Sequence, residues 1–289
     1  MEVKALVRTA IYTLILRHYR LEEAVALAKE LGYDAVEFTV GYKEAVWDGR
    51  SEWHLPLEGI ESAVPEVRRT LDRYGMPLVC LSTGLGFRDL DQLRRVFWAA
   101  SELGCPHIRV GTSPYDPKVG FWRQLSEVVE GWREVERLAK EFKVKALAEL
   151  HHGLIVASAS AMHMLVRNFD PQHVGVIFDP GNMVIEGREE WRKGMEILGD
   201  YLAHVHVKNA IMVRGKDGSW RPKWVGLDEG LADWRGIIRD LAEVGYEGAL
   251  SVEDFRQIPE EEDPRKMERR RAEEDLSFLR EALASVKGG

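Results

Sequence analysis

Residues 145–150 read KALAEL, residues 174–179 read VGVIFD, residues 202–209 read LAHVHVKN and residues 248–253 read GALSVE. Each is a short apolar run typical of a buried strand, and each carries an acidic or imidazole side chain near its C-terminal end. These side chains are Glu149, Asp179, His206 and Glu253. Because the C-terminal ends of the strands in a parallel barrel meet at one face, we expect these four side chains to lie close together.

The same alternation of short apolar runs with longer amphipathic segments extends through the rest of the chain. Four further strands are expected at residues 4–10, 35–40, 77–83 and 107–112. Helices are expected at 21–32, 58–74, 89–103, 119–142, 158–169, 189–199, 234–245 and 263–286. Strands that alternate with helices predict parallel strands joined by helical crossovers. Eight such units predict an α/β fold, a closed (β/α)8 TIM barrel that forms a single domain over residues 1–289.

An open doubly wound sheet is the alternative arrangement of the same elements. Such a sheet usually carries a glycine-rich phosphate-binding turn after its first strand. The corresponding residues here, RTAIYT at 8–13, contain no glycine, which favours the barrel.

One segment interrupts the alternation, MVRGKDGSWRPKW at residues 212–224. Its Lys-Asp-Gly-Ser turn signal predicts a β-hairpin or a lid over the catalytic face. Four of its side chains could contact a sugar or could simply be exposed: Arg214, Trp220, Arg221 and Trp224.

Composition and charge narrow the choice of partners. The chain has 40 basic and 48 acidic residues, a net charge of −8, whereas a nucleic-acid partner favours a basic surface. It has no apolar run near 18 residues and no signal-peptide cleavage pattern, so we expect no membrane partner and a cytoplasmic location. The two cysteines, Cys80 and Cys105, lack the spacing of a metal pair and are expected to be reduced thiols.

Three carboxylates and one imidazole form a ligand set that suits a hard divalent ion. Mn²⁺ or Mg²⁺ fits this set best, with Co²⁺ or Zn²⁺ as alternatives. Taken singly, each residue has an ordinary explanation: a glutamate in a surface ion pair, Asp179 as a turn or helix cap before Pro-Gly, His204 as a paired interior histidine. Because the four candidates occupy corresponding positions on four strand ends, we predict one shared metal site.

These segments resemble the xylose isomerase-like barrel superfamily, the sugar-phosphate isomerase/epimerase group. The resemblance covers essentially the whole chain and is strongest after residue 145. It is carried by AELHHG (148–153), IFDPGNMV (177–184), HVHVKN (204–209) and the block VGLDEGLADWRGIIRDLAEVGYEGALSVED (225–254). Members of the superfamily include ketose 3-epimerases, hydroxypyruvate isomerases, inosose dehydratases and endonuclease IV. The motifs are specific for the superfamily and do not select one of its members.

The resemblance implies that Glu149, Asp179, His206 and Glu253 are the metal ligands. In the epimerases the two glutamates also act as acid and base on opposite faces of the substrate. This chain would then be a divalent-metal-dependent sugar or sugar-phosphate isomerase or epimerase that transfers a proton through an enediolate. The resemblance further implies that His151 contacts substrate hydroxyls, while His152 is expected to point away.

Two more residues are candidates for substrate binding. Lys208 follows His206 by two residues and shares its side of the strand, so it could bind a substrate oxygen or phosphate or form a structural ion pair. Many relatives place a histidine where this chain has Asn182. Asparagine can bind a hydroxyl but is a poor zinc ligand, which argues against the trinuclear zinc cluster of endonuclease IV.

Two other functions stay open at this point. A metal-dependent dehydratase resembling inosose dehydratase would begin with the same proton abstraction and then expel a hydroxyl group. A barrel that binds sugar or metal without turnover would preserve the same residues. In each case the expected partner is a small sugar or polyol, and the resemblance implies a homodimer or homotetramer.

Overall fold

Eight parallel strands close into a barrel in this computed structural model, which describes residues 7–41 and 54–287. Around the barrel the strands follow one another in sequence order, with β10 closing the ring between β7 and β1. They are β1 (Arg8–Tyr12), β2 (Ala35–Val40), β3 (Leu78–Gly86), β4 (His107–Gly111), β5 (Lys145–Glu149), β6 (Val174–Phe178), β7 (Leu202–Val207) and β10 (Ala249–Val252). The predicted (β/α)8 TIM barrel is therefore confirmed.

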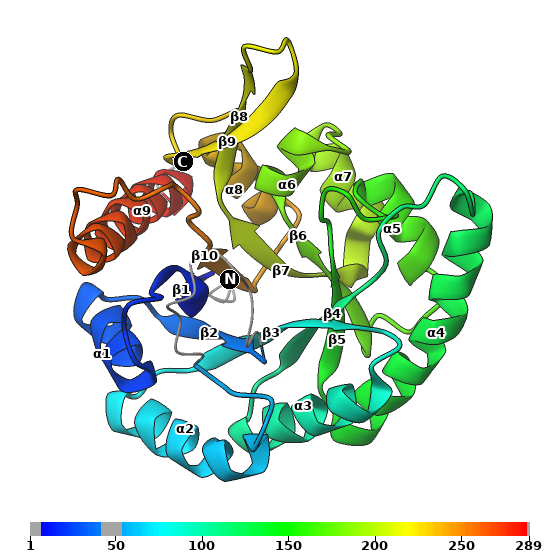
Figure 1. Cartoon of the computed structure of the whole chain (residues 1–289), viewed down its shortest axis with the longest axis horizontal. Helices are drawn as coiled ribbons and strands as arrows, with labels where there is room; N and C mark the ends of the chain where they lie inside the picture. The colour runs from blue at the N-terminus through cyan, green and yellow to red at the C-terminus, as the bar shows by residue number, and fades with distance from the viewer. Residues whose placement is uncertain (1–6, 42–53, 288–289) are drawn as a thin grey trace.

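Helices surround the barrel and cover the outer faces of its strands (Figure 1). They are α1 (Leu21–Leu31), α2 (Ile60–Tyr74), α3 (Leu90–Leu103), α4 (Phe121–Phe142), α5 (Ala159–Val166), α6 (Pro180–Ile185), α7 (Trp191–Leu198), α8 (Trp234–Glu243) and α9 (Pro264–Lys287). Two short 3₁₀ turns, Thr13–Ile15 and Gly199–Tyr201, follow β1 and precede β7. No described helix combines the length and hydrophobicity needed to cross a membrane.

Several predicted boundaries are corrected by the structure. The first strand begins at Arg8, and residues 4–6 of its expected range lie outside the described part of the chain. β3 continues past residue 83 because, after a bulge, Gly86 pairs with Gly111 of β4. α5 ends at Val166, before the expected residue 169, where the Asn168 side chain binds the carbonyls of Met164 and Leu165.

The structure contains one helix that the sequence pattern did not predict, α6. α6 begins directly after β6, and its six residues are too few to show a helical period in the sequence. Pro180 occupies its first turn and the Asp179 side chain caps its N-terminus by accepting the N–H of Asn182. The proline and the cap explain why the chain turns into a helix at this strand end.

The alternation of strand side chains separates the core from the barrel interior. Val36 and Phe38 of β2 are fully buried in the main hydrophobic core, which also contains residues of the surrounding helices. Glu37 lies between them in sequence and is also fully buried, so its side chain points into the barrel. Small side chains leave room for Glu37 inside the barrel, because Ala10, Ala35 and Ala249 belong to a separate cluster of buried residues there.

The predicted hairpin is present and projects outward from the ring of helices (Figure 1). β8 (Asn209–Arg214) pairs antiparallel with β9 (Trp220–Val225) directly after β7. Trp220 near the tip is 63% exposed, whereas Trp224 at the base packs against Phe255 in a tilted arrangement, with ring centroids 5.7 Å apart. Of the four candidate sugar contacts in this segment, the structure brings only Trp224 close to the strand ends.

A buried acidic pair links the end of β10 to α9 and predicts a pH-dependent stability. Arg256 donates to Asp254 at 3.0 Å and to Asp275 at 3.4 Å. Burial, reinforced by Asp254, raises the pKa of Asp275 to about 8. Because the folded state holds this proton more tightly than the unfolded state, the free energy of unfolding should fall as pH rises from about 4 to about 8.

Asp275→Asn should remove this slope, so that the stability of the variant relative to the wild type increases as pH rises from 5 to 8.5. The increase is about 1.4 kcal/mol for each pH unit over which the unfolded state is ionised and the folded state is not. Urea unfolding at both pH values measures it. An identical pH slope in the variant and the wild type would contradict the assignment.

Candidate metal centre

Four side chains from four strand ends converge at one end of the barrel. Their ligand atoms lie within 4.8 Å of one another, and all four residues are buried. They are Glu149 at the end of β5, Asp179 directly after β6, His206 in β7 and Glu253 directly after β10. His206 Nδ1 is the shared neighbour, at 3.0 Å from Glu149, 3.3 Å from Glu253 and 3.7 Å from Asp179. The structure thus brings together the four residues selected as ligand candidates.

Asn182 holds the carboxylates in place from the first turn of α6. Its backbone N–H donates to Asp179 Oδ1 at 2.9 Å, and its side-chain amide donates to Asp179 Oδ2 at 2.7 Å. The same amide lies 3.4 Å from Glu149 Oε1. Asp179 is therefore both a helix cap and a member of the cluster, because Oδ1 accepts the capping N–H while Oδ2 lies 3.7 Å from His206 Nδ1.

Two cations compensate the three carboxylates of the cluster. Arg109 of β4 lies 2.5 Å from Glu149 Oε2. Lys208, only 3% exposed, lies 2.6 Å from Asp179 Oδ2 and also contacts Glu253 Oε2. Each glutamate consequently has its own cationic partner, a guanidinium on one side and an ammonium on the other. Lys208 also lies 5.6 Å from the ring of Trp224 and 5.3 Å from that of Phe255.

These charges decide the protonation of the cluster. Burial would raise the pKa of Glu149, but the Arg109 guanidinium and His206 hold that pKa well below its usual range. Burial would likewise raise the pKa of Glu253, and Lys208 and His206 lower it. Burial raises the pKa of Asp179, despite the opposing charge of Lys208. The two glutamates are therefore carboxylates at neutral pH, with the charge needed to bind a cation.

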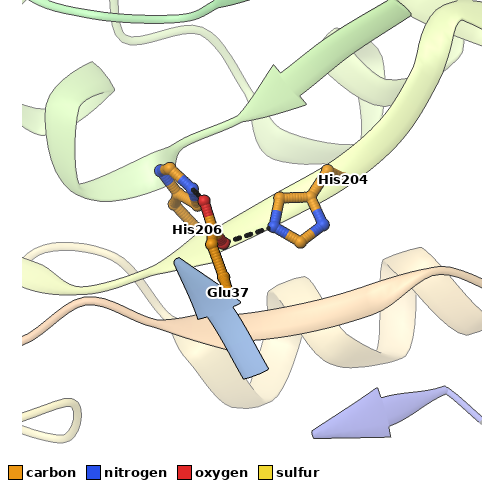
Figure 2. A group of neighbouring side chains, drawn as sticks. All are labelled: Glu37, His204 and His206. Atoms are coloured by element: carbon orange, nitrogen blue, oxygen red, sulfur yellow. Dashed lines mark hydrogen bonds and ion pairs between the residues drawn. The ribbon is translucent and has the colours of Figure 1, made fainter. Parts of the chain in front are cut away.

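Glu37 and Arg109 belong to the same charged network but were not among the predicted site residues. Glu37 of β2 accepts a hydrogen bond from His206 Nε2 at 3.1 Å and another from His204 Nε2 at 2.8 Å (Figure 2). His204 is thus a paired interior histidine, as expected. The sequence feature that could have indicated Glu37 and Arg109 is a single charged residue inside each of two short strands, AVEFTV and HIRVG. A charge in the interior of a barrel needs a partner, and the sequence does not indicate which one.

One of the two histidines after β5 differs from its prediction. His152 was expected to point away, yet its Nδ1 lies 2.9 Å from Asn182 Oδ1. The reason is that β5 ends at Glu149, so strand alternation no longer sets the direction of these side chains. His151 is partly exposed and stacks on His152 with ring centroids 4.5 Å apart. His151 therefore stands at the edge of the cluster.

The donor set fits a divalent cation. When the Nε2–H of His206 is donated to Glu37, the Nδ1 atom carries a lone pair that faces three carboxylates. Lys208 and Arg109 compensate part of this negative charge, and a metal ion or a proton on Nδ1 would compensate the remainder. Three carboxylate oxygens with one imidazole nitrogen form a ligand set used for Mn²⁺ and Mg²⁺.

Comparison with known proteins identifies the family. The model of the xylose isomerase-like TIM barrel family matches residues 25–282. The chain belongs to this family. The predicted superfamily is therefore confirmed, and the candidate metal centre lies within the matched region.

Relatives in this family include sugar-converting enzymes. The chain is 24% identical to an inosose dehydratase of Geobacillus kaustophilus over 272 residues, covering 82% of this chain and 80% of that one. It is 21% identical to a fructoselysine 3-epimerase of Escherichia coli O157:H7 over 264 residues, covering 85% and 90%. The homologues thus include both an epimerase and a dehydratase.

Solved structures show the same fold. A family member from Mycobacterium smegmatis, in complex with magnesium, superposes with a TM-score of 0.71 at 17% identity, covering 97% of both chains. Other structural neighbours include a D-psicose 3-epimerase, with a TM-score of 0.72 at 17% identity. At these identities the superpositions establish the barrel, while the reaction has to be inferred from the site.

Proposed function

We propose that this protein is a divalent-metal-dependent isomerase or epimerase of a sugar or sugar phosphate, acting by proton transfer beside a carbonyl group. The observation that carries the proposal is the convergence of four ligand atoms within 4.8 Å, two of them from glutamates on separate strands. The epimerases among its homologues and structural neighbours support the substrate class.

In this proposal Glu149, Asp179, His206 Nδ1 and Glu253 hold the divalent ion. Mn²⁺ or Mg²⁺ is preferred, with Co²⁺ or Zn²⁺ as alternatives. When bound, the ion supplies Lewis-acid polarisation of a substrate carbonyl and its neighbouring hydroxyl. It would compete with Lys208 for the oxygens of Asp179 and Glu253, since the ammonium contacts both.

Glu149 and Glu253 are the proposed acid and base. β6 and β7 separate β5 from β10 in the barrel, so the two carboxylates approach the centre from different directions. One can remove a proton from the substrate carbon while the other returns a proton elsewhere. Their cationic partners differ, because Glu149 is paired with an arginine and Glu253 with the flexible side chain of Lys208. A substrate oxygen that attracted Lys208 would free Glu253 Oε2 to accept a proton.

The remaining candidates are proposed to bind or orient. Lys208 and Trp224 would form a charged and an aromatic wall for a sugar, with His151 at the rim. Asn182 was predicted to bind substrate, but it is 1% exposed and its amide already serves Asp179 and His152. We therefore assign Asn182 to the orientation of Asp179.

A dehydratase is the second candidate function, and the inosose dehydratase relative favours it. The same base would remove a proton beside the carbonyl. The carbon–hydrogen electron pair then forms a carbon–carbon double bond as a neighbouring hydroxyl leaves with a proton, giving water. A barrel that binds sugar without turnover is the remaining alternative.

A substrate screen separates the three functions. The protein, supplemented with Mn²⁺ or Mg²⁺, is incubated in D₂O with panels of ketoses, aldoses and inososes, and the products are analysed by mass spectrometry and NMR. We expect an isomer or epimer in which solvent deuterium has entered the reacting carbon. A product that has lost one water would instead establish the dehydratase. Binding without turnover across the panels, with the metal bound, would contradict the proposed enzyme.

A further inference from the structure

Glu37 connects the candidate metal centre to the interior of the barrel. It comes from β2, whereas both histidines that it contacts come from β7 (Figure 2). Its Oε1 lies 3.1 Å from His206 Nε2 and its Oε2 lies 2.8 Å from His204 Nε2. Ser82 of β3 also donates to Oε1, at 2.5 Å. Glu37 is 0% exposed, so water does not compete for these bonds.

Glu37 on the Nε2 side and a metal ion on the Nδ1 side would together determine which ring nitrogen of His206 carries the proton. An ionised carboxylate has lone pairs and no hydrogen, so it can only accept. Both Nε2 atoms must then donate. Without an ion, the Nδ1 atom of His206 can carry a second proton toward Glu149, 3.0 Å away. With an ion on Nδ1, His206 is neutral and its one ring proton lies on Nε2. Nδ1 is the atom that faces Glu149, Asp179 and Glu253.

We propose that Glu37 is a positioning residue of the metal centre, holding His206 in the Nε2–H tautomer and aiming Nδ1 at the ion. His204 assists by occupying the other carboxylate oxygen, which prevents Glu37 from turning away from His206. This inference rests on the proposed metal-dependent function. Carboxylates that accept from metal-bound histidines orient the ring and increase its basicity.

A second metal ion bound by Glu37, His204 and His206 is the competing explanation, since their ligand atoms also cluster within 4.8 Å. Such an ion would need the Nε2 lone pair of His206. A neutral imidazole has one lone pair in the ring plane, so His206 would then leave the four-residue set. The two sites exclude each other while His206 is neutral, and the number of ions bound per chain separates them.

The test compares Glu37→Leu and Glu37→Gln with a matched control. Glu268→Gln is that control, because Glu268 is also a buried glutamate paired with a histidine, His18, at 2.6 Å. Dissociation constants for Mn²⁺ are measured by competition with a fluorescent chelator. Long-range ¹⁵N–¹H NMR of the Mg²⁺-loaded protein reads the tautomer of His206. Circular dichroism and metal-free melting temperatures monitor folding.

We expect Glu37→Leu to weaken Mn²⁺ binding by about 10–100-fold, the effect typical of removing such a partner. Glu37→Gln should have a smaller effect, because its amide oxygen can still accept from His206. Glu268→Gln should leave the Mn²⁺ affinity unchanged. The NMR spectrum of the wild type should show His206 protonated on Nε2.

Several results would overturn the inference. They are wild-type affinity in a folded Glu37→Leu variant, an equal loss of affinity in the control, an Nδ1–H tautomer in the Mg²⁺-loaded wild type, or two ions bound per chain. If Glu37→Leu does not fold, the Glu37→Gln affinity and the wild-type tautomer still decide. A wild type that binds no divalent ion would instead refute the proposed function, so the two failures are distinguishable.

Discussion

Glu253→Gln is expected to lower turnover by about 10³-fold, within the range typical of losing a general acid or base. The amide is nearly isosteric with the carboxylate but cannot take a proton from carbon. Glu149→Gln should have an effect of similar size, because the proposed reaction needs a group on each side of the substrate. Initial rates are measured on the substrate found in the screen, at saturating metal.

Saturating metal matters because both glutamates are also proposed ligands. At low metal the variants would lose activity simply through weaker binding of the ion. Glu268→Gln serves as a control, since it removes a buried carboxylate paired with His18, outside the metal cluster. Full activity in either Glu253→Gln or Glu149→Gln would refute the acid–base assignment, even if both residues bind the metal.

Removal of the divalent ion with a chelator should abolish turnover and lower the melting temperature. Three buried carboxylates face His206 Nδ1, and Arg109 and Lys208 compensate only part of their charge. At a metal concentration 100 times the dissociation constant, binding stabilises the folded state by about 2.7 kcal/mol. For a domain of this size each kcal/mol shifts the midpoint by about 2–4 °C.

The expected shift between chelated and metal-loaded protein is therefore about 5–10 °C. Differential scanning fluorimetry with EDTA, then with Mn²⁺, Mg²⁺, Co²⁺ or Zn²⁺ in excess, measures it and ranks the ions. Activity should return with the stabilising ions. Undiminished turnover after exhaustive chelation, with no detectable metal by elemental analysis, would contradict a metal-dependent reaction.

Much of the site could be predicted because barrel geometry gives it a sequence signature. KALAEL and GALSVE are short apolar runs with a glutamate at or next to their C-terminal end, and parallel strands place such ends at one face. The prediction used the length of each run and the acidic or imidazole side chain near its C-terminal end, and the family resemblance then implied the ligand roles. The runs and their polar residues are local properties, which explains why the eight strands and the four converging side chains could be predicted from the sequence.

The partners of these side chains could not be predicted in the same way. Glu37 meets His204 across 167 residues of sequence, and Arg109 meets Glu149 from the neighbouring strand. Alternation shows that Glu37 points inward, but which inward residue it meets depends on the stagger of strands around the closed barrel. His152 marks the same limit, because its direction was set by a turn beyond the end of β5.

The amino-acid order therefore specifies the strands, their closure into a barrel and the face at which four candidate ligands meet. It does so because the spacing of apolar residues and the length of each strand are local properties of the sequence. The hydrogen bonds that orient His206, the cation assigned to each glutamate and the side chains that cap the cluster arise only on closure. Closure and stagger bring together atoms from distant strands, and packing inside the barrel selects which of them touch.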